Sequence, residues 1–333
     1  MATVELEVDR VLQLILPHIK RHISAPPSIF EKGSFQRPFK LAVTGLQGSG
    51  KSTWSAEIVK AINKTGLKAK TLSLDDLYLP HDGLVAVRES NPGNKLVRTR
   101  GQPGTHDLEL AKWFFEQFDH PTTDERLFPV FDKSKFSGEG DRLPKSEWHR
   151  TEPGEVVDVL VFEGWCMGFQ AISDSALRTA WEESRAAAAI SNSTAAWAQG
   201  WAGSTDNTDN KLPTQTIANH ELEHLAFINE RLGEYNNMFM GPKHWNYLVH
   251  LDTDDLKNVY AWRLEQEAWL WKLKGTGMTD EAVIEFIKGY MPAYELYLGP
   301  LRQGFFQTIG GRTNCQLSMK LDSTRKIIEI REF

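Results

Sequence analysis

The sequence has little of what marks a secreted, membrane or nucleic-acid-binding protein. Its 333 residues include only two cysteines, Cys166 and Cys315, whose separation fits neither a metal motif nor a disulfide framework. No apolar run approaches the roughly 20 residues that a membrane-spanning helix needs, and acidic residues precede the first apolar segment, unlike a signal or transit peptide. The formal net charge of −6 gives no overall positive field for nucleic acid or an anionic membrane. We therefore expect a protein of the cytoplasm, or also of the nucleus, that binds neither nucleic acid nor membranes. The sequence predicts no particular oligomeric state.

From Lys40 onward, short apolar runs alternate with segments of helical character. We expect strands at residues 40–44, 69–75, 156–164, 246–252, 316–322 and 326–330, the last two forming a hairpin. Helices are expected at residues 51–61, 108–118 and 256–274. Strands that alternate with helices predict an α/β fold with a mostly parallel sheet covered on both faces.

Two segments fall outside this alternation. Residues 1–36 are expected to form an amphipathic helix, kinked at Pro17, and a linker that precedes one domain at residues 37–333. The apolar positions with helical spacing are Val8, Val11, Leu12, Ile15, Leu16 and Ile19. Residues 184–213 are rich in Ala, Ser, Thr, Asn and Gly, so we expect a low-complexity insertion whose second half is disordered or loosely packed.

A glycine-rich stretch, GLQGSGKST, follows the first predicted strand and precedes the first predicted helix. This spacing is typical of a P-loop, where glycines let backbone N–H groups surround a phosphate at the positive end of a helix. Lys51 would contact the β- and γ-phosphates, and the hydroxyl of Ser52 would ligate Mg²⁺. A glycine-rich turn with an accidental lysine is the alternative. The residues expected to bind nucleotide are Gly45, Leu46, Gln47, Gly48, Ser49, Gly50, Lys51, Ser52 and Thr53.

The sequence does not favour a GTPase switch, because the Asn-Lys pairs at Asn63, Asn94 and Asn210 lack the aspartate of the guanine-binding motif. A small-molecule kinase needs instead a base for the acceptor hydroxyl, a carboxylate for the metal, and cations near the transferred phosphoryl group. ATP and Mg²⁺ are the expected cofactors.

Three carboxylates lie where ligands bind in open α/β sheets, at predicted strand ends. Asp75 and Asp76 end the second strand, and only one can face the γ-phosphate because neighbours on a strand point opposite ways. The alternative is that both are turn or cap residues. Glu163 ends a strongly apolar strand, where a carboxylate needs a cation, so we expect it to coordinate the metal. Arg263 is expected to close over the phosphates as a lid residue, with a solvated helix arginine as the alternative.

A basic cluster in loops broken by glycine and proline comprises Arg98, Arg100, Lys133, Lys135 and Arg142. Surface ion pairs are one explanation. The other is a pocket for a small anionic acceptor, since a carboxylate needs such cations.

A zinc-protease pattern, H-E-x-x-H, also occurs, at His220 to His224. It lacks a third histidine within the metzincin span, and its flanks fit an ordinary helix with Leu225 and Leu232 on one side. A zinc hydrolase therefore ranks well below a kinase. An ATP-binding sensor or assembly factor without a metabolite substrate is the other alternative.

Six motifs in order resemble the D-glycerate 3-kinase family, especially its fungal branch of P-loop kinase-like proteins, and more distantly uridine kinase, phosphoribulokinase and pantothenate kinase. The motifs are GLQGSGKST, LSLDDLYLP, RGQPGTHDLEL, PVFDKSKFSGEGDR, VFEGWCMGF and WRLEQE…MPAYELYL. The resemblance covers about residues 39–302 without the insertion. It implies a doubly wound P-loop kinase fold with a helical lid, and phosphoryl transfer from ATP to a small acceptor, D-glycerate in the plant members.

The resemblance also implies roles for individual residues. Asp75 corresponds to the base of uridine kinases and Glu163 to their strand-end glutamate, while Asp107 falls where they bind the acceptor. The full set expected to contact the acceptor is Asp76, Tyr78, Arg100, Asp107, Lys133, Lys135 and Arg142.

Overall fold

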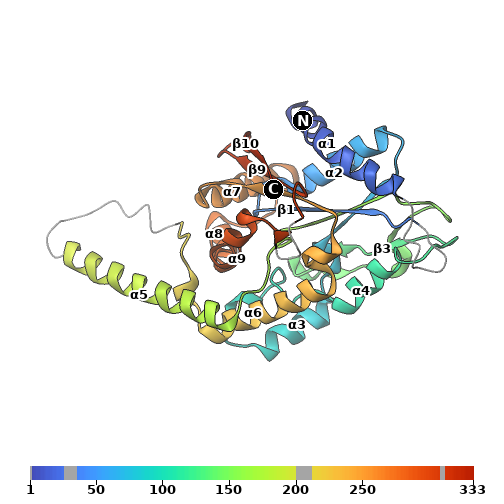
Figure 1. Ribbon diagram of the computed structural model, residues 1–333. Coiled ribbons are helices and arrows are strands. Elements are labelled where there is room, and N and C mark those ends of the chain that lie inside the picture. Colours follow the sequence, from blue (N-terminus) through green and yellow to red (C-terminus); the bar gives the residue numbers. More distant parts are fainter. Residues whose placement is uncertain (1, 26–35, 200–211, 308–311) are drawn as a thin grey trace.

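The computed structural model describes residues 2–25, 36–199, 212–307 and 312–333 (Figure 1). The strands of its main sheet are β1 (Phe39–Gly45), β2 (Ala69–Ser73), β7 (Val159–Gly164), β8 (Tyr247–Asp252), β9 (Gln316–Leu321) and β10 (Ile327–Glu332). They lie in the order β10-β9-β8-β1-β7-β2. All neighbouring pairs are parallel except β9 and β10, which form the expected closing hairpin. The predicted α/β fold with a mostly parallel sheet is confirmed.

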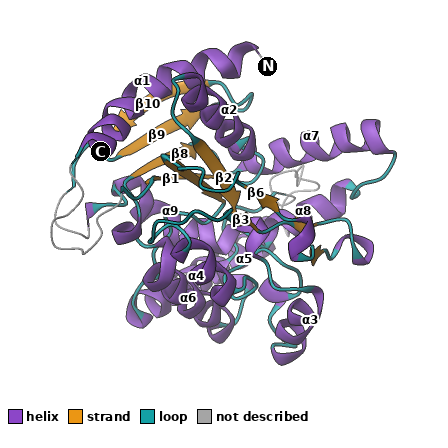
Figure 2. Cartoon of the chain, turned by 90° about the vertical axis from the view of Figure 1, so that its right-hand side faces the viewer, coloured by secondary structure: helices purple, strands orange, loops and turns teal. Residues whose placement is uncertain are grey.

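Helices cover both faces of this sheet. The described helices are α1 (Ala2–Ser24), α2 (Lys51–Lys64), α3 (His81–Ser90), α4 (Leu108–Glu116), α5 (Asp174–Gln199), α6 (Leu222–Tyr235), α7 (Lys257–Lys274), α8 (Asp280–Lys288) and α9 (Met291–Gln303). Figure 2 shows α1 and α2 on one side of the sheet, with α4, α6 and α9 on the other. None of the helices in the described segments has the length and apolar content to cross a membrane.

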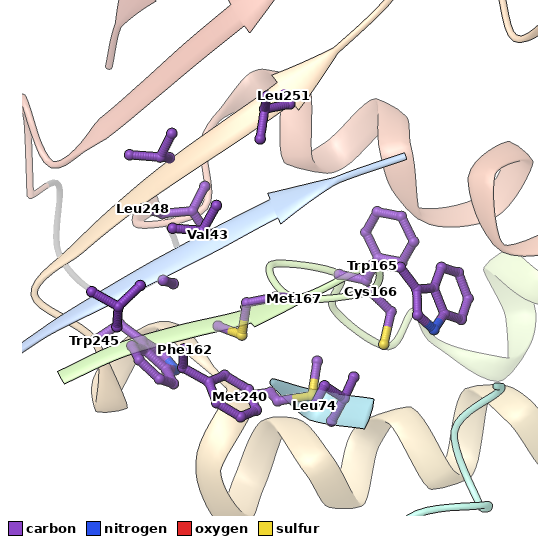
Figure 3. Close-up of a cluster of buried hydrophobic side chains, with 14 of the residues drawn as sticks. Val43, Leu74, Phe162, Trp165, Cys166, Met167, Met240, Trp245, Leu248 and Leu251 are labelled. Carbon is purple, nitrogen blue, oxygen red and sulfur yellow. The ribbon is translucent and has the colours of Figure 1, made fainter. Parts of the chain in front are cut away.

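The central strands are apolar because both of their faces are covered. Every residue of β7 and β8 is buried. Val43, Phe162 and Leu248 come from three adjacent strands and line the core that Figure 3 shows. The ring of Phe162 stacks on Trp245 with 5.5 Å between centroids. This rigid centre fixes the carboxyl ends of β1, β2 and β7, where the candidate site lies.

The N-terminal helix packs on the domain, as expected. Val8, Val11 and Ile15 are buried, and α1 lies against α2 and β1. Pro17 lies inside α1 without ending it. The linker expected after α1 falls on residues 26–35, outside the described segments.

The predicted insertion begins within a helix. Residues 184–199 continue α5, which extends away from the sheet in Figure 1. Most of its second half, residues 200–211, lies outside the described segments, so the expectation of disorder there stays a prediction.

One predicted boundary is wrong in a way that affects the site. Strand β2 ends at Ser73, and Leu74–Leu77 form a 3₁₀ turn in place of a longer strand. The turn is stabilised by the side chain of Ser73, whose Oγ accepts a hydrogen bond from the backbone N–H of Asp75. The sequence pattern also missed four strands of two residues each. Strand β4 (Phe131–Asp132) pairs with β5 (Asp141–Arg142), and β3 (Leu127–Phe128) pairs with β6 (His149–Arg150). Strands this short carry no periodicity.

Candidate active site

The glycine-rich loop has the strand–loop–helix context that the sequence predicted. Strand β1 leads into it at Gly45, and α2 begins at Lys51. Gly48 and Gly50 have φ angles of 79° and 89°, in the left-handed region that favours glycine. A Cβ atom on Gly48 would lie 2.7 Å from the Cβ of Trp262, so a side chain there would collide with α7. The first N–H groups of α2 are thereby left to face a phosphate group.

Residues far away in the sequence hold this loop in place. The backbone N–H of Gln47 donates to the hydroxyl of Tyr294 at 3.0 Å. The Nε of Arg325, in the β9–β10 hairpin, donates to the carbonyl of Gly48 at 2.7 Å, and its Nη2 donates to the carbonyl of Trp262. Sequence analysis missed Tyr294 and Arg325, because nothing near the P-loop motif points to partners on α9 and on the last hairpin.

Ser52 and Glu163 meet at the start of α2. The hydroxyl of Ser52 donates to Oε1 of Glu163 at 2.9 Å. Glu163 is buried on β7, between Val43 of β1 and Ser73 of β2. A hydroxyl and a carboxylate side by side are the hard oxygen donors that Mg²⁺ prefers, so this pair fits the predicted metal site.

Each carboxylate oxygen of Asp75 has a hydrogen-bond partner. Its Oδ1 accepts the hydroxyl of Tyr78 at 3.0 Å, and its Oδ2 accepts the ammonium of Lys133 at 2.5 Å. Burial by itself raises the pKa of Asp75, but the positive charges of Lys133 and Lys51 outweigh burial and bring the pKa to about 2. Asp75 is therefore ionised at neutral pH and lies within electrostatic reach of the P-loop lysine.

Asp76 points elsewhere and has the opposite pKa shift. Its Oδ1 accepts the backbone N–H of Phe131 at 3.2 Å. Burial raises its pKa to about 6, and the negative charge of Asp75 adds to the rise. The premise that both aspartates end a strand is wrong. On the 3₁₀ turn their side chains still diverge, because successive residues are about 120° apart around its axis.

A buried aromatic group supports Tyr78. The ring of His106 stacks on Tyr78 with 4.4 Å between centroids, and its Nδ1 lies 3.0 Å from the hydroxyl of Tyr235. Burial lowers the pKa of His106 to about 3, so the ring is neutral. His106 and Tyr235 thus stabilise the tyrosine that binds Asp75. Sequence analysis did not select either residue, since a single histidine next to Asp107 carries no spacing signal.

Arg142 and Asp107 form part of the wall behind Tyr78. The Nη2 of Arg142 donates to the carbonyl of Tyr78 at 2.7 Å and to Oδ2 of Asp107 at 2.9 Å. The other oxygen of Asp107 accepts the backbone N–H of Leu110 and caps α4. Both oxygens of Asp107 therefore have protein partners, and this aspartate acts as the N-terminal cap of α4.

Arg100 covers the same aromatic side chains from the other direction. Its Nη1 donates to the carbonyls of Gly138 and Glu139, at 2.5 and 2.6 Å. Its guanidinium carbon lies 5.9 Å from the ring centroid of Tyr78 and 5.7 Å from that of Phe131.

The predicted basic cluster is thus only partly assembled. Arg100, Lys133 and Arg142 surround Tyr78. The ammonium of Lys135 has no hydrogen bond or ion pair within the described segments. Arg98 lines a neighbouring cavity instead.

Arg263 is no solvated helix arginine. Its side chain is 18% exposed, and its Nη2 lies 2.9 Å from Oε2 of Glu267 on the next turn of α7. Its guanidinium lies 5.4 Å from the ring centroid of Phe286. A Cβ atom on Gly48 would lie 3.2 Å from the backbone nitrogen of Arg263, so α7 passes directly over the P-loop.

The H-E-x-x-H pattern does not form the helix that was expected across it. Helix α6 begins at Leu222, and His220 lies before it, at the end of a 3₁₀ turn. Its carbonyl accepts the indole N–H of Trp181 at 2.8 Å. His220 and His224 are therefore not on successive turns of one helix, which is the arrangement that this zinc motif requires.

Known kinases are similar to this protein over nearly the whole chain. No family model matches it. A solved D-glycerate 3-kinase from Cryptococcus neoformans superposes with a TM-score of 0.78 and 29% identity, over 98% of this chain and 99% of that one. The chain is 32% identical to the uncharacterized kinase mug58 of Schizosaccharomyces pombe, over 90% of this chain and 91% of that protein. It is 30% identical to the probable ATP-dependent kinase TDA10 of Saccharomyces cerevisiae, over 95% and 94%.

The fold, the glycine-rich loop and these relatives define the molecule as a P-loop kinase, an ATP-dependent phosphotransferase with an alcohol group as acceptor. The prediction of an ATP-dependent phosphotransferase is confirmed, and the alternative of an ATP-binding sensor or assembly factor is not supported. More narrowly, the chain belongs to the D-glycerate 3-kinase family, as the six motifs indicated.

Proposed function

We propose that this kinase transfers the γ-phosphoryl group of ATP to a hydroxyl of a small anionic acceptor, with D-glycerate as the first acceptor to test. The name of the Cryptococcus relative supports glycerate. The observation that carries the proposal is the position of Asp75, an ionised carboxylate held by Tyr78 within electrostatic reach of Lys51.

In the proposed reaction, the acceptor oxygen forms a bond to the γ-phosphorus while the bond from that phosphorus to the bridging oxygen breaks. The products are the phosphorylated acceptor and ADP, and the hydroxyl proton passes to Asp75. Lys51 stabilises the negative charge on the transferred group. The nucleotide is held by the loop Gly45, Leu46, Gln47, Gly48, Ser49, Gly50, Lys51, Ser52 and Thr53.

Ser52 and Glu163 would hold Mg²⁺, which neutralises phosphate charge when bound. Arg263 lies on the helix above the P-loop, where a lid residue belongs, and its release from Glu267 would free it for the phosphates.

Lys133 and Arg100 are the cations best placed for the anionic end of the acceptor, because Lys133 contacts the base and Arg100 covers Tyr78. Asp76, Asp107 and Arg142 shape the surrounding wall, and Lys135 adds charge from the same loop.

The test is a panel of hydroxylated metabolites, D-glycerate included, scored for acceptor-dependent ADP release in the presence of Mg²⁺. Lys51→Ala should reduce turnover by about 10²-fold or more, since it removes a donor to the transition state. Near-normal turnover in this variant would place the nucleotide site elsewhere. A wild-type enzyme that binds ATP but responds to no hydroxylated metabolite would contradict the proposed function.

A further inference from the structure

A cavity of about 630 Å³ adjoins the candidate active site. Its walls come from the loop at residues 95–102, from residues 216–220, and from residues 278–290, which include α8. Sites for small molecules commonly have about 300–1,000 Å³, so this cavity is large enough to hold one.

One residue of the cavity wall contacts the group around Asp75, and a second is close enough to be affected by its charge. Arg100 lies over the ring of Tyr78, whose hydroxyl binds Asp75. Burial raises the pKa of Tyr290, the second of these residues, and the negative charge of Asp75 raises it further. Through Arg100, the cavity therefore adjoins the tyrosine that binds the proposed base.

The cavity wall is positively charged, although the whole chain has a net charge of −6. It contains four cations, Lys95, Arg98, Arg100 and Lys288, and one carboxylate, Glu285, which pairs with Lys288 at 2.5 Å. Throughout the segments that the structure describes, the side chains of Lys95 and Arg98 form no hydrogen bond or ion pair. An anionic ligand would complement such a wall.

The cavity wall also contains uncharged polar side chains. Gln102 is 4% exposed, and its Nε2 donates to the carbonyl of Gly289 at 2.7 Å. Its Oε1 is buried and has no partner in the described structure. The side chain of Gln102 is therefore packed into the wall. Thr99 and Asn219, which also line the cavity, can bind hydroxyl groups of a ligand.

The volume exceeds what glycerate needs. Glycerate has three carbons and four oxygens. At about 30 Å³ for each water-sized group, it fills at most about 210 Å³. That is about one third of the cavity.

We propose that the preferred acceptor of this enzyme is larger than glycerate: a polyhydroxylated molecule with a phosphate or carboxylate group remote from the hydroxyl that is phosphorylated. The remote anion of this larger acceptor lies against Lys95 and Arg98, beyond Lys133 and Arg100, which would bind the carboxylate of the shorter glycerate. In both cases the reacting hydroxyl lies toward Asp75. This inference rests on the proposed kinase function and specifies its substrate class.

The experiment compares D-glycerate, gluconate, ribose 5-phosphate and uncharged ribose as acceptors in the ADP-release assay. We expect gluconate or ribose 5-phosphate to exceed glycerate in kcat/KM by about tenfold or more, and ribose to be poor. Arg98→Gln and Lys95→Gln should each lower kcat/KM for the larger anion about tenfold, the equivalent of roughly 1.4 kcal/mol. Turnover of glycerate and the KM for ATP should be unchanged.

A steric variant and matched controls complete the design. Ala282→Trp, at an exposed position of α8 in the cavity wall, should reduce turnover of the larger acceptors and spare glycerate. Arg178→Gln and Lys112→Gln remove exposed cations outside the cavity and should change nothing. Thermal melting checks that every variant is folded.

The outcomes separate the two proposals. If glycerate is the best acceptor and the cavity variants handle every acceptor like the wild type, the larger acceptor is excluded and the kinase function stands. If no probe stimulates ADP release, the proposed function fails. Calorimetric titration of ribose 5-phosphate then tests the ligand class assigned to the cavity. Binding to the wild type that is weaker in Arg98→Gln supports this class, and no binding to the wild type overturns it.

Discussion

Asp75 and Asp76 are adjacent carboxylates whose pKa values the protein shifts in opposite directions. Lys133 and Lys51 keep Asp75 ionised despite its burial. Asp76 accepts a backbone N–H of the neighbouring hairpin, and burial dominates its pKa. Pairs of carboxylates whose environments separate their pKa values are typical of sites with acid–base chemistry.

Asp75→Asn should reduce turnover by about 10²-fold or more, because asparagine keeps the size and most hydrogen bonding of the base but cannot accept a proton. ATP affinity should change little, since the P-loop supplies most nucleotide contacts. Steady-state turnover and an ATP titration measure both effects. Asp76→Asn is the matched control and should reduce turnover less. An inactive Asp76→Asn with an active Asp75→Asn would reverse the assignment of the base.

Asp76→Asn should also change how stability depends on pH. The folded pKa of about 6 lies above the ordinary 3.8, so the protonated carboxyl is favoured in the folded state. Its contribution is fully present below about pH 3.8 and is lost as the pH rises through about 6. Asparagine never ionises. The Tm advantage of the variant should therefore grow from about pH 4 to about pH 7 and then level off.

The opposite shift of Asp75 gives the internal check. Its stabilising contribution is present above the ordinary pKa of 3.8 and is lost only as the pH falls toward about 2. Asp75→Asn should therefore show no growing advantage between about pH 4 and pH 7. Equal Tm differences for Asp76→Asn at both pH values would contradict the burial of that carboxyl.

At the scale of elements, the P-loop depends on the last hairpin of the chain. Arg325 donates to the carbonyls of Gly48 and Trp262 and pairs with Glu265 on α7 at 2.5 Å. Its φ of 65° is maintained by the hairpin turn. One side chain therefore joins β10, α7 and the phosphate loop.

Arg325→Ala should weaken ATP binding about tenfold and destabilise the fold by about 1–3 kcal/mol, because it leaves the Gly48 carbonyl without its charged donor. Alanine has the same backbone strain at this left-handed φ as arginine, so the loss of stability and ATP affinity measures the contribution of the arginine side chain. Nucleotide titration and urea unfolding measure the two effects. Lys326→Ala, at the next and exposed position, is the control. Unchanged ATP affinity in Arg325→Ala would show that the loop keeps its shape without the hairpin.

At the scale of the whole molecule, the N-terminal helix is part of the core. Ile15 is fully buried, whereas Leu6 on the same helix is 71% exposed. Ile15→Ala should lower the free energy of unfolding by about 2–5 kcal/mol, through lost burial and the cavity left behind. Leu6→Ala should change it by no more than about 0.5 kcal/mol. If urea unfolding shows equally small effects for Ile15→Ala and Leu6→Ala, α1 does not contribute to the stability of the core.

Much of this molecule follows from local sequence patterns. The apolar runs predicted all six strands of the main sheet, because a strand covered on both faces must be apolar throughout. The phosphate loop was recognisable because its glycines, its lysine and its serine lie within nine residues, and backbone conformation there is a local property. The boundary of β2 was missed because a serine side chain, a local but non-periodic cause, ends the strand early.

Only the tertiary structure decided which side chains meet. Asp75 and Lys133 are 58 positions apart, and Gly48 and Arg325 are 277 apart. The aromatic group around His106 and the walls of the cationic cavity likewise join separate segments. Periodicity reports whether a residue faces the core, but its partners depend on sheet order and helix packing. The sequence thus determined the fold class and the phosphate loop, and the packing of distant segments determined the environment of the base and the shape of the acceptor cavity.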